Sequence, residues 1–80
     1  MQPVEVTARF DKRGKVTPKS FVLDGKQQRI DGVGRRWLAD DGEHILVMIQ
    51  PGDQVLELVY KRESGEWWLV KRHDPRRGFA

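Results

Sequence analysis

The sequence predicts an all-β protein, a six-stranded antiparallel meander that forms a small, partly open barrel or a strongly twisted sheet without substantial helix. The first observation is the alternation of apolar and polar residues in several short runs. The second is three short loops that end in glycine, at 12–14, 40–42 and 63–65. Each suits a three-residue hairpin in which the glycine takes the left-handed conformation. The third is Asp24-Gly25, a two-residue turn signal.

The length and composition limit the possible classes of protein. The chain has 80 residues, no cysteine and a net charge of +3, from 15 Lys and Arg against 12 Asp and Glu. We expect one domain over residues 1–73, followed by a basic, flexible tail at 74–80. No apolar run approaches the roughly 20 residues that span a membrane, and no signal peptide precedes the first strand. A soluble, cytoplasmic protein without membrane contact is therefore expected.

The first hairpin joins a strand from Val4 to Phe10 to a strand that ends at Leu23. Alternation in the first of these runs has the period of a half-buried strand. The loop at 12–14 sets Asp11 against Lys15, an ion pair, and Phe10 against Val16.

Pro18 interrupts the second strand, because proline cannot donate a ladder hydrogen bond. The strand therefore lies at an edge or bulges at this point, and a bulge turns Phe21 and Leu23 toward the core.

The third strand runs from Lys26 to Ala39 after the type I′ turn at Asp24-Gly25. Its interior glycines weaken a regular strand, so we predict a sharp bend around residues 32–34. The alternative is a turn at Asp31-Gly32 followed by a single helical turn.

The next hairpin uses the loop at 40–42, because a turn at Asp41-Gly42 would oppose the carboxylates of Asp40 and Glu43. The longer loop sets Ala39 against Glu43 and pairs Trp37 with Ile45. The following run, His44 to Ile49, is apolar on both faces, which is typical of a central strand.

The last hairpin follows a turn at residues 51–53 and joins Val55–Arg62 to Glu66–His73. A loop at 63–65 produces four favourable cross-strand pairs: Arg62 with Glu66, Tyr60 with Trp68, Leu58 with Val70, and Glu57 with Lys71. This register places Trp68 in the core and Trp67 on the opposite face.

The sequence lacks the residue patterns of catalysis and of metal or cofactor binding. His44 and His73 lie in different predicted strands without His or Cys at ligand spacing. Ser64 lies in a tight turn, and the carboxylates are scattered among lysines and arginines. We therefore predict no catalytic residue, no metal, no cofactor and no enzymatic activity.

The predicted outer face of the last hairpin is the candidate binding surface. It presents Trp67 directly across from Lys61, with Lys71 farther along the strand. An indole flanked by ammonium groups can stack a nucleic-acid base at roughly 1–3 kcal/mol while the cations hold phosphates. The alternative is that Trp67 belongs to the core or is covered by lysine stems.

Further cations extend this candidate surface. Arg72, Arg76 and Arg77 lie in the basic C-terminal segment, and Arg35 lies on the same face as Trp37. A basic extension beside a stacking face can follow a phosphate backbone. The alternative for the tail is a solvated terminus. The predicted partner is single-stranded nucleic acid, contacted weakly, or a DNA-repair protein.

A second hypothesis uses the same apolar surface for protein association. Since a central strand must be covered on both faces, the sheet either closes on itself or pairs with another copy. Trp67 and Leu69 would then serve a homodimer interface, so both a monomer and a homodimer remain open.

The order of several residues resembles a family of small bacterial domains of unknown function. The resemblance lies in segments 18–21 and 57–60, residues Gly25 and Trp37, and the segment 67–70. Similar segments occur at the carboxyl end of some Y-family polymerase homologues of mutagenic DNA repair. The resemblance covers about two thirds of the chain, through turn and hydrophobic residues. It implies a non-catalytic accessory module near DNA-repair machinery, and the arginine-dense turn of those relatives is replaced here by residues 24–27.

Overall fold

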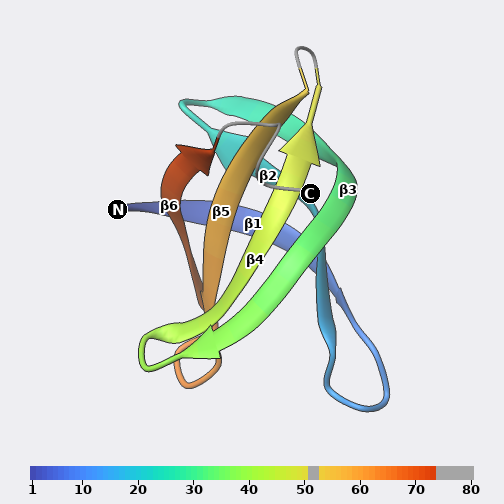
Figure 1. Ribbon diagram of the computed structural model, residues 1–80, viewed down its shortest axis with the longest axis vertical. Helices are drawn as coiled ribbons and strands as arrows, with labels where there is room; N and C mark the ends of the chain where they lie inside the picture. The colour runs from blue at the N-terminus through green and yellow to red at the C-terminus, as the bar shows by residue number, and fades with distance from the viewer. Residues whose placement is uncertain (51–52, 74–80) are drawn as a thin grey trace.

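A computed structural model of the protein, which describes residues 1–50 and 53–73, is a closed barrel of six antiparallel strands (Figure 1). The strands follow one another around the barrel in chain order: β1 (Gln2–Phe10), β2 (Val16–Leu23), β3 (Lys26–Ala39), β4 (Gly42–Ile49), β5 (Gln54–Lys61) and β6 (Glu66–His73). The predicted all-β meander is thus confirmed, and the sheet closes. No helix among the described residues is long and apolar enough to cross a membrane.

Up-and-down connectivity places the connections at two opposite ends of the barrel. The loops that follow β1, β3 and β5 lie at one end, the lower end in Figure 1, and the turn after β2 lies at the other. The three glycine-containing loops of the sequence therefore share one end, called the loop end below.

The first hairpin has the predicted register, but the predicted ion pair between Asp11 and Lys15 is not formed; Oδ1 of Asp11 accepts from the backbone N–H of Lys15 instead. Phe10 pairs with Val16, and the backbone N–H of Asp11 donates to the carbonyl of Lys15 at 3.0 Å. The predicted bulge is also present, because Thr7 pairs with Ser20 whereas Ala8 pairs with Pro18. The extra residue turns the side chains that follow it toward the barrel interior.

The turn between β2 and β3 is confirmed, since Asp24 and Gly25 both have positive φ, at 52° and 77°. β3 continues as one strand past its glycines, and its pairing with β4 shifts twice, between Ile30 and Gly32 and between Val33 and Arg36. These irregularities accommodate the curvature of β3 around the barrel, as Figure 1 shows. The alternative of a helical turn after Asp31-Gly32 is wrong.

The register of the third hairpin differs from the prediction by one residue. Ala39 pairs with Gly42, so the loop holds two residues and Trp37 pairs with His44 instead of Ile45. The cause is tertiary: a Cβ on Gly42 would lie 2.4 Å from the carbonyl oxygen of Tyr60 in β5. Glycine is needed inside the ladder at this close approach, not in the loop.

The register of the last hairpin is also shifted by one residue. Lys61 pairs with Glu66 and Tyr60 with Trp67, so the loop holds four residues, and the backbone N–H of Gly65 donates to the carbonyl of Lys61 at 2.8 Å. The predicted pairs Arg62–Glu66, Tyr60–Trp68 and Leu58–Val70 are therefore wrong. The pair Glu57–Lys71 is nevertheless present, because a register shift after Glu57 restores the predicted alignment.

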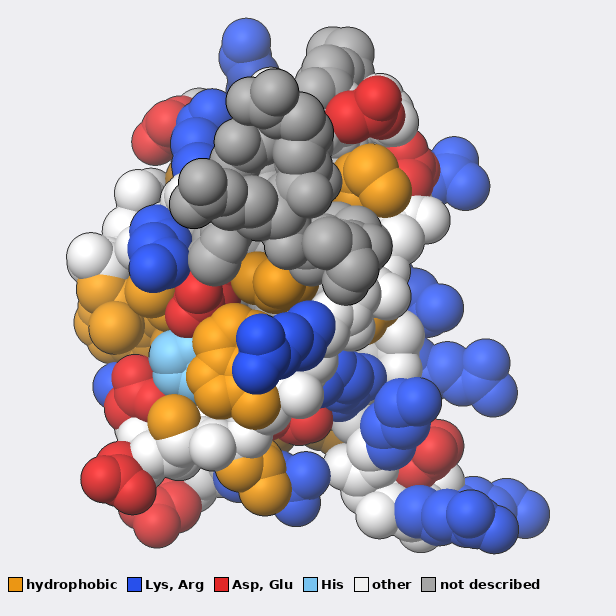
Figure 2. All heavy atoms as spheres, in the orientation of Figure 1, with side chains coloured by type: hydrophobic (Ala, Val, Ile, Leu, Met, Phe, Trp, Pro, Cys, Tyr) orange, Lys and Arg blue, Asp and Glu red, His pale blue; other side chains and the backbone are white. Residues whose placement is uncertain are grey.

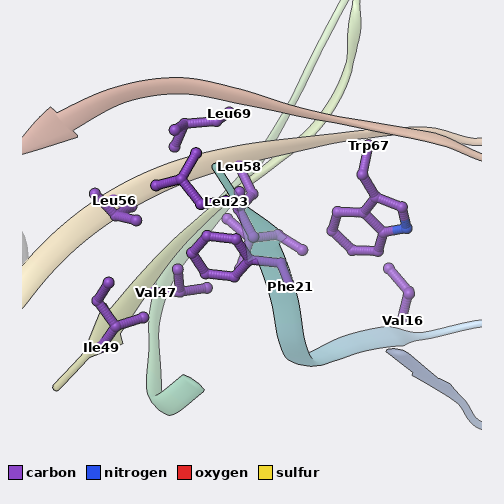
Figure 3. Packing of buried hydrophobic residues seen from close by; sticks show 10 residues of the cluster. Val16, Phe21, Leu23, Val47, Ile49, Leu56, Leu58, Trp67 and Leu69 are labelled. Carbon is purple, nitrogen blue, oxygen red and sulfur yellow. The ribbon is translucent and has the colours of Figure 1, made fainter. Parts of the chain in front are cut away.

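The hydrophobic core lies inside the barrel, and its buried cluster draws on four strands, β2, β4, β5 and β6. Figure 3 shows Phe21 among side chains of β2, β4, β5 and β6, with Trp67 and Val16 facing one another nearby. The cluster consists of Val16, Phe21, Leu23, Ile45, Val47, Ile49, Leu56, Leu58, Trp67 and Leu69. Val4, Val6 and Ala8 of β1 pack against it. The core thus includes Phe21 and Leu23, as predicted, and also Trp67.

The side chain of Arg36 bridges an opening between β2 and β3 near the loop end. These strands pair only between Ser20–Leu23 and Lys26–Arg29. Beyond this stretch, the guanidinium of Arg36 donates to the carbonyl of Val16 at 2.5 Å and to the carboxylate of Glu43 at 3.1 Å. The side chains of Arg36 and Glu43 are 19% and 13% exposed, so this pair is largely desolvated. Arg36 therefore satisfies a β2 carbonyl that β3 does not reach.

Replacement of Gly42 tests the origin of the β3–β4 register. We expect Gly42→Ala to lower the free energy of unfolding by about 3 kcal/mol, because the added Cβ meets the Tyr60 carbonyl and the residue has a φ of 139°. Gly32→Ala is the matched control, since its Cβ would make ordinary contact with Met48 at 3.7 Å. Urea unfolding of both variants measures the difference, and equal stability would contradict the explanation.

Candidate nucleic-acid interface

A row of four side chains crosses the outer face of the barrel. Trp37 of β3 pairs with His44 of β4, His44 pairs with Val59 of β5, and Val59 pairs with Trp68 of β6. Residues directly opposite one another in an antiparallel sheet point to the same face. The two indoles therefore lie at the ends of one row, with an imidazole and a valine between them.

His44 is held between two carboxylates. Its Nδ1 lies 2.6 Å from Oε2 of Glu57, and its Nε2 lies 2.7 Å from Oδ1 of Asp41. His44 and Glu57 are 8% and 5% exposed, whereas Asp41 lies in the exposed β3–β4 loop. The imidazole therefore ties this loop to the middle of β5.

The two carboxylates favour the protonated imidazole. Burial alone lowers the pKa of His44, but the hydrogen bonds to Asp41 and Glu57 outweigh it and raise the pKa above its usual value of 6.5. The reciprocal hydrogen bond from His44 lowers the pKa of the Asp41 carboxyl below 3.8. Each ring nitrogen lies within hydrogen-bond distance of a carboxylate oxygen, so the surroundings of His44 favour its protonated form.

A second set of contacts stacks three side chains at one end of the row. The indole of Trp37 lies on the imidazole of His44 with ring centroids 5.2 Å apart and an interplanar angle of 18°. The guanidinium carbon of Arg35 lies 5.4 Å from the centroid of Trp37. Arg35 is exposed and Trp37 is half-buried, so the stack leads from a buried imidazole to a guanidinium in solvent. The prediction that Arg35 shares a face with Trp37 is confirmed.

The other end of the row repeats the combination of an indole and a cation. The ammonium of Lys61 lies 5.0 Å from the ring centroid of Trp68, which is half-buried. Lys71, which pairs with Glu57, is exposed on the same outer face. The predicted cations Lys61, Lys71 and Arg35 are thus brought to one surface.

Trp67, the centre of the predicted surface, is not part of it. It is 6% exposed and packs inside the barrel with its ring centroid 4.7 Å from that of Tyr60. The expectation of an outward Trp67 across from Lys61 is therefore wrong, and Trp68 occupies the outer position. The cause is the four-residue loop, because a shift of one residue exchanges the two faces of a strand.

The remaining predicted cations lie elsewhere. Arg72 pairs with Leu56, an interior residue, and its guanidinium donates to Oε1 of Gln54 at 3.0 Å. It therefore does not share the face of Trp68. Arg76 and Arg77 lie outside the described residues.

Sequence reasoning did not find His44, Asp41 and Glu57 as one cluster. A histidine in an otherwise apolar central strand is a signal, because a buried imidazole needs partners for both nitrogens. These partners are Asp41 in the β3–β4 loop and Glu57 in β5. Their positions depend on the registers of the β3–β4 and β4–β5 hairpins. Trp68 was noticed, but it was assigned to the wrong face.

The row combines a fully hydrogen-bonded imidazole with indoles and cations. Both nitrogens of His44 are occupied by carboxylates, and in residues 1–50 and 53–73 no group of three or more His, Cys, Asp or Glu is arranged to hold a metal ion. What the row presents outward is two indoles with a cation on each.

Comparisons with protein-family models, curated proteins and solved structures found no match for this chain. The fold and the row define it as a small closed antiparallel barrel with an aromatic and cationic outer face. The resemblance to domains associated with mutagenic-repair polymerases stays a prediction.

The pKa shifts predict the pH dependence of stability. The pKa of His44 is raised in the folded state. The stability that protonated His44 contributes is therefore complete below pH 6.5, and it is lost as the pH rises through the pKa of the folded state. The pKa of Asp41 is lowered, so the stability that its carboxylate contributes is present above pH 3.8 and is lost as the pH falls below that value. We expect the free energy of unfolding of the wild type to decline on the alkaline side of pH 6.5, as measured by urea unfolding.

The variant His44→Gln should not show this alkaline decline, whereas His73→Gln, which removes the other histidine, should retain it. We also expect His44→Gln to be less stable at pH 6 by about 2 kcal/mol, because it lacks hydrogen bonds to charged groups. Parallel profiles for the wild type and His44→Gln would show that His44 is not the titrating group.

Proposed function

We propose that the protein is a non-catalytic module that binds single-stranded nucleic acid weakly through the row on its outer face. The observation that carries the proposal is the pairing of each indole with a cation, Trp37 with Arg35 at 5.4 Å and Trp68 with Lys61 at 5.0 Å. Flat π-surfaces beside cations match a chain of bases joined by phosphates. A DNA-repair context, implied by the family resemblance, is part of this proposal.

The stack of His44, Trp37 and Arg35 favours a base-stacking role. A guanidinium plane is itself a surface on which unpaired bases stack, and it is weakly hydrated compared with an ammonium. Because Arg35 lies on an indole that is stacked on the buried imidazole of His44, less side-chain freedom is lost when a base stacks upon the guanidinium.

The charge of the row supports contact with phosphates. Asp41 and Glu57 both hydrogen-bond to His44, which when protonated offsets one of their two charges, while three cations, Arg35, Lys61 and Lys71, lie on the same face. The outer face therefore presents cations that an anionic ligand can contact. Affinity should therefore fall as salt rises.

Homodimerisation through the outer face of β4 to β6 has less support. The apolar residues there, Leu46, Val55 and Val59, are 4%, 1% and 0% exposed, so they leave little apolar surface for a second copy. Trp67 and Leu69, which that hypothesis places at the interface, belong to the core. The alternative remains testable by sedimentation, as a mass that rises with concentration.

Titration with single-stranded oligothymidylate at low salt tests the proposal. We expect amide shifts near Trp37, Lys61 and Trp68, and the variant Trp68→Leu should bind about 5- to 150-fold more weakly, since stacking contributes about 1–3 kcal/mol per base. Fluorescence anisotropy of a labelled oligonucleotide measures the affinity. Circular dichroism confirms that the variant retains the barrel.

Lys61→Gln and Lys26→Gln form a matched pair of charge variants. Lys26 is exposed beside the Asp24-Gly25 turn, at the opposite end of the barrel from Lys61. We expect the salt dependence of binding to decrease by about 0.7 in slope for Lys61→Gln and to be unchanged for Lys26→Gln. No amide shifts at low salt, or equal effects of the two variants, would exclude the row as the binding site.

A further inference from the structure

The β1–β2 hairpin concentrates positive charge on a part of the barrel away from the aromatic row. Residues 9–19 hold five cations and one carboxylate, a formal +4, whereas the whole chain carries +3. The cations are Arg9, Lys12, Arg13, Lys15 and Lys19, and all five are exposed. The rest of the chain is therefore slightly acidic, and the basic character of the protein resides in this hairpin.

The single carboxylate of the hairpin serves the loop backbone. Oδ1 of Asp11 accepts hydrogen bonds from the backbone N–H groups of Arg13 and Lys15, each at 2.9 Å. The carbonyl of Asp11 also accepts from Gly14 at 3.0 Å, and Gly14 has the positive φ of 83° that this loop requires. The loop conformation is thus held by Asp11.

The five cations lack carboxylate partners. Among the described residues, no ion pair within 4.0 Å involves Arg9, Lys12, Arg13, Lys15 or Lys19. Arg9, Lys15 and Lys19 line one shallow hollow of about 240 Å³, together with Asp11 and Thr17. These side chains therefore share one face of the hairpin and direct uncompensated charge into solvent.

The hairpin also stands apart from the other loops. In Figure 1 its loop extends at the lower right, away from the loops that follow β3 and β5. Figure 2 shows Lys and Arg side chains gathered over this hairpin. A two-stranded ribbon is narrow enough to enter the major groove of a duplex, which is about 12 Å wide.

We propose that the β1–β2 hairpin binds the phosphodiester backbone of duplex nucleic acid, independently of base sequence. The proposal goes beyond the row of indoles, because it concerns another surface and a ligand without unpaired bases. Contacts to phosphates position a protein without reading sequence, and their strength derives from the release of counterions. The loop tip, Lys12-Arg13-Gly14, carries no apolar side chain, and the nearby Phe10, although 56% exposed, packs edge-to-face on Tyr60 with ring centroids 5.8 Å apart. With five cations around one aromatic ring, the chemistry of the hairpin favours nucleic acid over a lipid surface.

Two double variants that remove the same charge test the proposal. Lys12→Gln/Lys15→Gln alters the hairpin, and Lys26→Gln/Arg29→Gln alters the opposite end of the barrel and the neighbouring stretch of β3. With a short blunt-ended DNA duplex, we expect the first pair to lower the slope of log affinity against log salt by about 2, and to weaken binding several-fold at low salt. The second pair should leave both unchanged.

The remaining measurements separate this proposal from its rivals. Amide shifts on addition of the duplex should concentrate in residues 9–19, and Trp68→Leu should not change duplex affinity. If oligothymidylate binding fails while the hairpin variants lose duplex binding, the function of the row is excluded and the hairpin site stands. Equal effects of the two double variants, no duplex binding by the wild type, or binding to phosphatidylserine vesicles in its place would overturn the proposal.

Discussion

The close approach of Gly42 to the carbonyl of Tyr60 is the constraint on which the rest of the barrel depends. A Cβ at Gly42 would lie 2.4 Å from that oxygen, so only a residue without a side chain allows β4 to approach β5 this closely at its first residue. Because Ala39 pairs with Gly42 and Glu43 with Tyr60, the alignment is transmitted to β3 and β5. This alignment places the side chains of Arg36 and Glu43 on the interior face of the sheet, and those of Trp37 and His44 on its outer face.

The outer face combines a buried charge with solvent-exposed cations. The imidazole of His44 lies between two carboxylates, and the carboxylate of Glu57 is 5% exposed. Such a desolvated charge is stable only when its hydrogen bonds are satisfied in one geometry. We interpret the cluster as the base of the Trp37 and Arg35 stack, since it holds the indole in place from beneath. The cations of the basic hairpin, by contrast, are all exposed.

Local signals predicted part of the structure correctly. The first hairpin and the Asp24-Gly25 turn follow from nearby residues, because their loops require positive φ and are closed by short-range hydrogen bonds. The other two glycine-ended loops were assigned one residue out of register. Gly42 lies in β4 against the carbonyl of Tyr60, not in the loop before it. The loop that ends at Gly65 holds four residues instead of the predicted three. The first error placed Ile45 instead of His44 opposite Trp37, and the second placed Trp68 instead of Trp67 opposite Tyr60.

The sequence by itself determined that the chain forms antiparallel hairpins, that Arg35 accompanies Trp37, and that Trp67 and Trp68 lie on opposite faces. Alternation along a strand is a local property, so it separates adjacent residues without knowledge of their partners. Only the tertiary structure decided which tryptophan is buried, and that His44 meets Asp41 and Glu57. These outcomes depend on strand register, which is set by contacts such as that of Gly42 with Tyr60, between residues 18 positions apart in the chain.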